Sequence, residues 1–248
     1  MTELAYMVRE DWAQQGTAME QSSATIRSWL GDKKLVYAVG RPDMFNDKAR
    51  NIERGTAMQI GDTTTPAPVV GLEQLSDLAA RDDASDIAVV AIHPRDPREC
   101  DAMRNAYETE SLDRMYVQIW APSNLARSWV EGQGAIDLHT GRAVETPDPV
   151  QVAGCELIVN EEYNGLSTGN GKDTVIQVLR SFNAEGYPLD TDTWLRAYFS
   201  AGGAFRHAEV VKKFVEEVAG GKRHRVTDRF LPEIVGILRE QVAKTPPK

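Results

Sequence analysis

The chain has 248 residues, of which 42% are hydrophobic and 26% are charged, a composition typical of a globular protein and not of a disordered one. No apolar run reaches the roughly eighteen residues of a membrane span, and the first residues lack a basic region followed by an apolar stretch, so we expect a cytoplasmic protein without a secretory signal. The net charge of −9 disfavours non-specific binding to nucleic acid.

Residues 3–30 are the first predicted element. Ile26, Trp29 and Leu30 recur at helical spacing, and Gly31 is a typical residue at a helix end. This pattern predicts either one long helix or two shorter helices over the first thirty residues.

Four short apolar runs follow this segment. They cover residues 35–39, 87–92, 116–120 and 157–159. Each run is nearly continuous instead of alternating between apolar and polar residues, which is typical of strands that are buried on both faces of a parallel sheet. Val69-Val70 or Met58-Gln59-Ile60 could add an edge strand.

Helical patterns occupy the intervals between these strands. They cover residues 73–81, 97–108, 124–131 and 172–182, whereas residues 140–152 are expected to form a surface loop. The intervals are long enough for right-handed crossovers between parallel strands. We therefore predict an α/β fold with a three-layer, mostly parallel sheet that is Rossmann-like in the loose sense.

The pattern changes near residue 186, where a cluster of three helices begins. These helices are predicted over residues 191–201, 205–219 and 231–242. We therefore expect an α/β domain over residues 1–185, with an N-terminal helix, and a C-terminal helical module over residues 186–248. Residues 204–248 hold ten lysines and arginines against six acidic residues, so this last part of the chain is basic.

Ligands of open α/β sheets bind at the carboxyl ends of the strands. The richest loop at such a place spans residues 160–174, between the fourth predicted strand and a helix. Its ligand-binding candidates are Asn160, Gly169, Gly171 and Lys172, because glycine-rich backbone and a lysine at a helix start favour an anion. Glu161 is a candidate general base. Solvated carboxylates and a flexible connection remain the alternative interpretation of this loop.

Two motifs resemble parts of this loop but do not match it. A phosphate-binding P-loop requires glycine where Leu166 stands, and serine or threonine where Asp173 stands. Residues 165–169 match G-x-S-x-G, but the motif begins several residues after the predicted strand, so Ser167 lacks the strained turn of a nucleophile elbow. Neither motif therefore identifies a reaction.

Two further strand-end loops hold candidate site residues. His93 follows the second predicted strand and is a candidate catalytic group, although a histidine bonded to backbone is the favoured interpretation. Arg41 and Asp43 follow the first predicted strand and are candidate ligand-binding residues, but they could also pair with each other. The spacing of His93, Asp96 and Cys100 fits no known metal site, so no metal is expected.

Two functions from different classes fit these features, and no motif decides whether the protein is an enzyme or which cofactor it uses. The first is the binding of a phosphorylated or nucleotide-like small molecule at the strand-end loops. The second is a regulatory or accessory role, in which the basic C-terminal module contacts a protein partner, nucleic acid or a second copy of the chain. Nucleic acid is the less favoured of these partners because the chain as a whole is acidic.

Overall fold

The computed structural model describes residues 2–9, 19–45 and 52–244. Contacts divide the chain into two compact units, an α/β unit (Met1–Val130 with Gly134–Val144) and a helical unit (Glu131–Gln133 with Glu145–Lys248). This division falls earlier in the chain than the boundary expected at residue 185, because the helices before that point pack against the C-terminal helices.

Within the described residues, the α/β unit is built on a seven-stranded sheet with the order β3-β2-β4-β5-β1-β6-β7. The strands are β1 (Glu3–Val8), β2 (Lys34–Val39), β3 (Val69–Gly71), β4 (Ile87–Ile92), β5 (Arg114–Ile119), β6 (Ile136–Asp137) and β7 (Arg142–Ala143). Strands β1 to β6 run parallel, and the short β7 pairs antiparallel with β6 at one edge. The predicted mostly parallel sheet is confirmed, and Val69-Val70 forms the edge strand β3.

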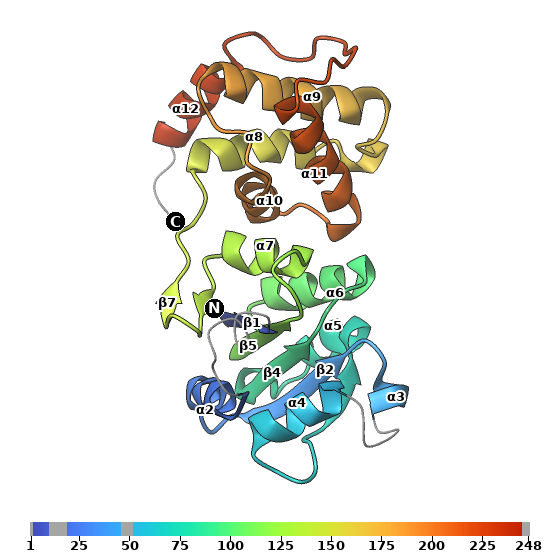
Figure 1. The fold of residues 1–248 in the computed structure, drawn as a ribbon, viewed down its shortest axis with the longest axis vertical. Helices are drawn as coiled ribbons and strands as arrows, with labels where there is room; N and C mark the ends of the chain where they lie inside the picture. The colour runs from blue at the N-terminus through green and yellow to red at the C-terminus, as the bar shows by residue number, and fades with distance from the viewer. Residues whose placement is uncertain (1, 10–18, 46–51, 245–248) are drawn as a thin grey trace. The chain divides into compact units, whose positions relative to one another are not determined.

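Helices cover both faces of this sheet, which gives the predicted three layers (Figure 1). The helices are α2 (Met19–Leu30), α3 (Pro42–Phe45), α4 (Ile52–Gly61), α5 (Leu75–Ala79), α6 (Pro97–Glu108) and α7 (Leu125–Gly132), with 3-10 turns η1 (Leu72–Gln74) and η2 (Ala84–Asp86). Helices α2 and α4 lie on one face, and α5, α6 and α7 lie on the other (Figure 1). The connection after β2 therefore leaves the sheet on the opposite face from the connection after its neighbour β4.

Strand β4 lies at the centre of the core, and all six of its side chains are buried. The chain after β4 is held by the start of α6, where the Asp96 side chain accepts a hydrogen bond from the Arg98 amide at 2.8 Å. Pro97 occupies the first turn of α6, as the sequence predicted. This cap fixes the loop that carries His93.

The prediction of helix throughout residues 3–30 is wrong at its start. Residues Glu3–Val8 form β1, which pairs with β5 on one side and with β6 on the other. Five of its six side chains are buried. A short apolar segment of this kind has no decisive local preference, and the two neighbouring strands determine its conformation. The helix begins at Met19. Gly16, a residue that could divide the predicted helix in two, lies outside the described residues.

The helical unit contains α8 (Pro149–Val159), α9 (Gly169–Ala184), α10 (Thr191–Ser200), α11 (Phe205–Ala219) and α12 (Ile234–Lys244), with a 3-10 turn η3 (Glu162–Asn164). The strand predicted over residues 157–159 is wrong, because these residues form the last turn of α8. The loop predicted over residues 140–152 is also too long, since Asp148 caps α8 and Pro149 begins it. Helix-capping at Asp148 and packing against α9, α10 and α12 outweigh the strand preference of Ile158 and Val159.

The connection between α11 and α12 lies along α9. Gln177 of α9 accepts a hydrogen bond from the Arg229 amide at 2.6 Å and donates one to the Phe230 carbonyl at 3.0 Å. The basic residues Lys222 to Arg225 therefore lie in a connecting segment that is bound to α9, where Lys172 and Arg180 donate to the carbonyls of Arg225 and His224. None of the described helices is long and apolar enough to cross a bilayer.

Candidate functional site

The carboxyl ends of β2 and β4 form the candidate site of the α/β unit. These strands are neighbours, and the chain leaves them toward opposite faces of the sheet. In an open α/β sheet, this arrangement opens a crevice at the strand ends, which is where ligands bind. A pocket of about 300 Å³ lies at this edge, and we call it the sheet-edge pocket. It is lined by Arg41, Met44, Ile52, Glu53, His93, Arg95 and Trp120.

His93 is the most unusual residue of the sheet-edge pocket. It directly follows β4, its backbone has a positive φ of 52°, and only 4% of its surface is exposed. Such a backbone conformation is uncommon for a residue other than glycine. Neither ring nitrogen has a hydrogen-bond partner among the described residues. The alternative interpretation of His93, a histidine bonded to backbone, therefore does not hold for its side chain in this part of the chain.

The surroundings of His93 keep its imidazole neutral. Burial lowers its pKa to about 3, and the positive charges of Arg95 and Arg9 act in the same direction. A neutral imidazole has one N–H donor and one acceptor nitrogen. His93 can therefore give one hydrogen bond to a ligand and accept another at physiological pH.

Trp120 follows β5 and holds two arginines beside His93. The guanidinium carbon of Arg9 lies 4.5 Å from the centre of the Trp120 ring, and that of Arg95 lies 4.8 Å from it. The rings of His93 and Trp120 meet edge to face with centroids 4.9 Å apart. Cation–π contacts of this kind hold positive charge near an aromatic ring. The Nη1 atom of Arg9 is buried and has no hydrogen-bond partner among the described residues.

Arg41 and Asp43 pair with each other, which is the alternative that the sequence left open. Two hydrogen bonds, of 3.1 and 3.0 Å, join the Arg41 guanidinium to the Asp43 carboxylate. This contact lowers the pKa of Asp43 and raises the pKa of Arg41. Arg41 lines the sheet-edge pocket, whereas Asp43 is its exposed partner. The roles of both residues in binding stay predictions.

The other candidates from the sequence belong to the helical unit and not to a strand-end loop. Residues 157–159 are helical, so the loop of residues 160–174 does not follow a strand. Its predicted position at the sheet edge is therefore wrong. Asn160 caps the end of α8, and Glu161 forms an ion pair with Arg229 at 2.5 Å. Lys172 donates a hydrogen bond to the Arg225 carbonyl at 3.2 Å. These contacts give Glu161 and Lys172 a structural role within the helical unit.

The two candidate glycines stand in the first turn of α9, and both have a backbone reason to be glycine. Gly169 has a positive φ of 57°, which glycine adopts without strain. A side chain at Gly171 would collide with the backbone carbonyl of Gly165. Thr168 is the N-cap residue of α9 but makes no side-chain capping bond. Gly171 therefore serves the close approach of loop and helix, and Gly169 serves the positive φ at the start of α9.

The sequence reasoning missed Arg9, Arg95, Trp120 and Glu53 as site residues. The sequence predicts Trp120 as the last residue of a buried strand. Its position at a strand end, where ligands of α/β sheets bind, could have identified it as a candidate site residue. Arg9 was missed because residues 3–30 were predicted as helix, so the strand end after Val8 was not recognised. Glu53 lies in α4, and burial raises its pKa.

No metal centre is formed by the described residues, in which no three His, Cys, Asp or Glu side chains are grouped as metal ligands. Cys100 and Cys155 are both buried and free of disulfides, and burial raises the pKa of each thiol. Comparisons of the chain with protein-family models, curated proteins and solved structures found no match. The residues of the sheet-edge pocket are therefore the basis for a functional interpretation.

Proposed function

We propose that the α/β unit binds an anionic small molecule, phosphorylated or nucleotide-like, in the sheet-edge pocket. The observation that carries this proposal is His93, which lines the pocket beside arginines and whose buried ring nitrogens have no partner among the described residues. A buried polar group without a hydrogen bond destabilises the free protein. A ligand that bonds to His93 would remove this cost.

The charge of the pocket supports an anion. Arg95 lines it, Arg9 lies on the Trp120 ring beside it, and Arg41, which also lines it, is paired with Asp43. Glu53 also lines the pocket, but burial raises its pKa and so opposes its negative charge. Guanidinium groups bind phosphate oxygens through paired N–H donors, which makes a phosphoryl group the anion that suits this set of arginines.

The apolar lining supports a ligand that is larger than phosphate alone. Met44 and Ile52 line the pocket although 53% and 49% of their surfaces are exposed, and Trp120 adds an aromatic ring. Exposed apolar side chains beside a set of cations are typical of sites for ligands with an apolar or planar part and an anionic part. With a pKa of about 3 the imidazole of His93 is a weak base, so its part in this proposal is to hydrogen-bond the ligand.

A binding experiment on the full chain tests this proposal. We expect ATP, AMP or ribose 5-phosphate to raise the midpoint of thermal unfolding, because a ligand stabilises the state that binds it. Isothermal titration of the best of these ligands would then compare Arg95→Gln with Arg98→Gln. Arg95 lines the pocket, whereas Arg98 is an exposed arginine of α6 outside the lining. Loss of one charge-assisted contact should weaken binding about tenfold or more in Arg95→Gln.

The control should leave the affinity within about twofold of the wild type, since surface charges far from a ligand contribute little in physiological salt. Absence of binding by all the phosphorylated compounds would contradict the proposal. Equal weakening in both variants would also contradict it, because the effect would then come from net charge and not from the pocket.

The alternative function, partner binding through the basic C-terminal residues, has less support from the contacts of the helical unit. Lys222 and His224 both pair with Glu217, at 2.5 and 3.2 Å, and Arg229 pairs with Glu161. Glu217 and Glu161 therefore compensate Lys222 and Arg229 within the unit, whereas burial lowers the pKa of His224 and favours its neutral form. Arg223 and Arg225 are exposed and would be the residues to substitute in a test of that alternative.

A further inference from the structure

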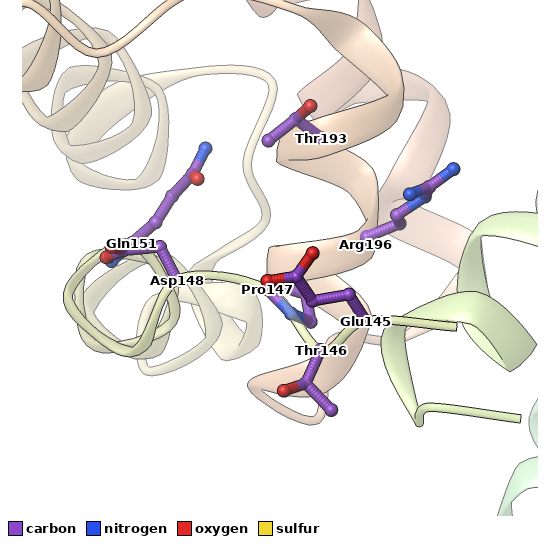
Figure 2. A pocket seen from close by; sticks show the side chains of 7 residues that line it. All are labelled: Glu145, Thr146, Pro147, Asp148, Gln151, Thr193 and Arg196. Atoms are coloured by element: carbon purple, nitrogen blue, oxygen red, sulfur yellow. The ribbon is translucent and has the colours of Figure 1, made fainter. Parts of the chain in front are cut away.

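A second pocket lies in the helical unit, between the start of α8 and helix α10. It has a volume of about 270 Å³ and is lined by Glu145, Thr146, Pro147, Asp148, Gln151, Thr193 and Arg196. Figure 2 shows Gln151 and Asp148 at the start of α8, Thr193 and Arg196 on α10, and Glu145 in the segment that leads into α8. We call it the α8–α10 pocket.

Gln151 is the first sign that the α8–α10 pocket is built for a ligand. Only 3% of its surface is exposed, and its Nε2 atom has no hydrogen-bond partner among the described residues. The great majority of buried side-chain polar atoms in proteins are hydrogen-bonded, so a buried amide without a partner requires an explanation. A ligand oxygen in the pocket would provide the missing acceptor.

Arg196 is the second sign. Its Nη2 atom forms an ion pair at 2.5 Å with the carboxylate of Glu131, a residue of which only 3% of the surface is exposed. Its Nε atom is buried and has no hydrogen-bond partner in the described part of the chain. Gln151 and Arg196 therefore both line this pocket, and each has a buried N–H donor without a partner among the described residues.

The remaining charges of the α8–α10 pocket are negative. Glu145 and Asp148 are exposed and take part in no ion pair among the described residues. One oxygen of Asp148 caps α8 by accepting from the amides of Val150 and Gln151, at 2.8 and 3.0 Å. Because Glu131 compensates Arg196, the lining has an excess of negative charge, which favours a cationic ligand.

We propose that the α8–α10 pocket binds an α-aminoacyl group, in which a protonated amine stands next to a carbonyl. The amine interacts with the carboxylates of Glu145 and Asp148, and the carbonyl oxygen accepts from Gln151 Nε2. A peptide N-terminus and a free amino acid both contain this group. The site is separate from the sheet-edge pocket and does not depend on the function proposed for it.

Three small compounds test the two halves of this group on the full-length protein by isothermal titration. Alaninamide has both the amine and the carbonyl, N-acetylalaninamide lacks the charged amine, and ethylamine lacks the carbonyl. We expect alaninamide to bind and each partial compound to bind about tenfold more weakly or worse, because each loses a charge-assisted or buried hydrogen bond. Dialanine and free alanine, titrated beside them, identify the source. Tighter binding of dialanine indicates a peptide N-terminus, and tighter binding of alanine indicates a free amino acid.

Substitutions in the lining connect this binding to the pocket. Gln151→Leu removes the buried donor at similar volume, so binding should fall about tenfold while the unfolding temperature of the free protein stays equal or rises. Asp148→Asn removes the charge but retains a good helix cap, and it should also weaken binding. Glu209→Gln, an exposed carboxylate of α11 outside the pocket, is the matched control and should leave binding unchanged.

Three binding results would overturn the proposal. They are no binding of alaninamide, dialanine or alanine to the wild type, equal binding of N-acetylalaninamide and alaninamide, or an unchanged affinity in Gln151→Leu. A fall in the unfolding temperature of Gln151→Leu would show that Nε2 has a structural partner, and it would count against the proposal in the same way.

Discussion

His93 combines three properties that rarely occur together in one residue. It is almost fully buried, its backbone lies in the left-handed region, and its ring nitrogens lack partners among the described residues. Each property raises the free energy of the folded state. Uncompensated strain at a strand end is typical of functional sites, which is why we place the ligand there.

The lowered pKa of His93 gives a pH dependence with a definite sign. The ring has a pKa of about 3 in the folded protein and near 6.5 when unfolded, so only the unfolded chain takes up this proton between those values. The free energy of unfolding should therefore fall as the pH falls from 6.5 toward 3. Asparagine adopts a positive φ more readily than most residues, so His93→Asn should keep the backbone conformation. In this variant the part of the pH dependence that comes from His93 should disappear.

Urea unfolding at a series of pH values measures this effect as the difference between wild type and His93→Asn. The carboxylates titrate in both proteins and largely cancel in that difference. A difference that stays constant with pH would show that His93 keeps an ordinary pKa in the folded protein, and would contradict the burial described here.

Strand β1 and helix α8 show how neighbours decide the conformation of a short apolar segment. Both segments contain a few consecutive apolar residues, and the sequence alone assigned helix to the first and strand to the end of the second. Strand β1 is fixed by pairing with β5 and β6, whereas residues 157–159 continue a helix that Asp148 caps. Local preference is too weak to choose between these outcomes.

The position of β1 inside the sheet can be tested with two proline substitutions. Ala5 pairs with β5 and with β6, so Ala5→Pro should remove a ladder hydrogen bond inside the sheet and destabilise the α/β unit by about 3 kcal/mol or more. Val70→Pro lies in the edge strand β3, which pairs with β2 alone among the described strands. Its effect on the free energy of unfolding should be clearly smaller.

Circular dichroism during urea unfolding would compare the two variants. If Ala5→Pro were tolerated as well as Val70→Pro, residues 3–8 would not be an internal strand, and the helix expected from the sequence would have to be reconsidered.

The whole chain has two compact units, and each has a core of its own. In the α/β unit the core follows β4, β5 and their neighbours. In the helical unit an aromatic cluster joins α9 to α10, with the rings of Phe182 and Trp194 5.4 Å apart. Two separate cores suggest that a defect in one unit changes the stability of that unit first.

A core truncation in the helical unit tests this independence. Phe182 is fully buried, so Phe182→Ala should destabilise the helical unit by about 3–5 kcal/mol. Hydrogen exchange followed by mass spectrometry should show faster exchange in peptides from 149–244 and little change in peptides from β2, β4 and β5. Equally accelerated exchange in both regions would mean that the chain unfolds as a single cooperative unit.

The sequence by itself determined the central strands and the general place of a site. The three longer of the four apolar runs became β2, β4 and β5 because burial on both faces leaves a strong pattern, and Arg41 and His93 follow two of those strands. The α/β class and the helical C-terminal region could therefore be predicted. The glycine-rich loop after residue 160 could not be placed correctly, since its position depended on the shortest of the four runs.

Only the tertiary structure decided which residues share a pocket. Arg9, His93 and Trp120 lie far apart in the sequence and meet because β1, β4 and β5 lie close together in the sheet and end at the same edge. Gln151 and Arg196 likewise line one pocket through the packing of α8 against α10. Strand order and helix packing depend on long-range contacts, which short-range patterns in a single sequence do not encode.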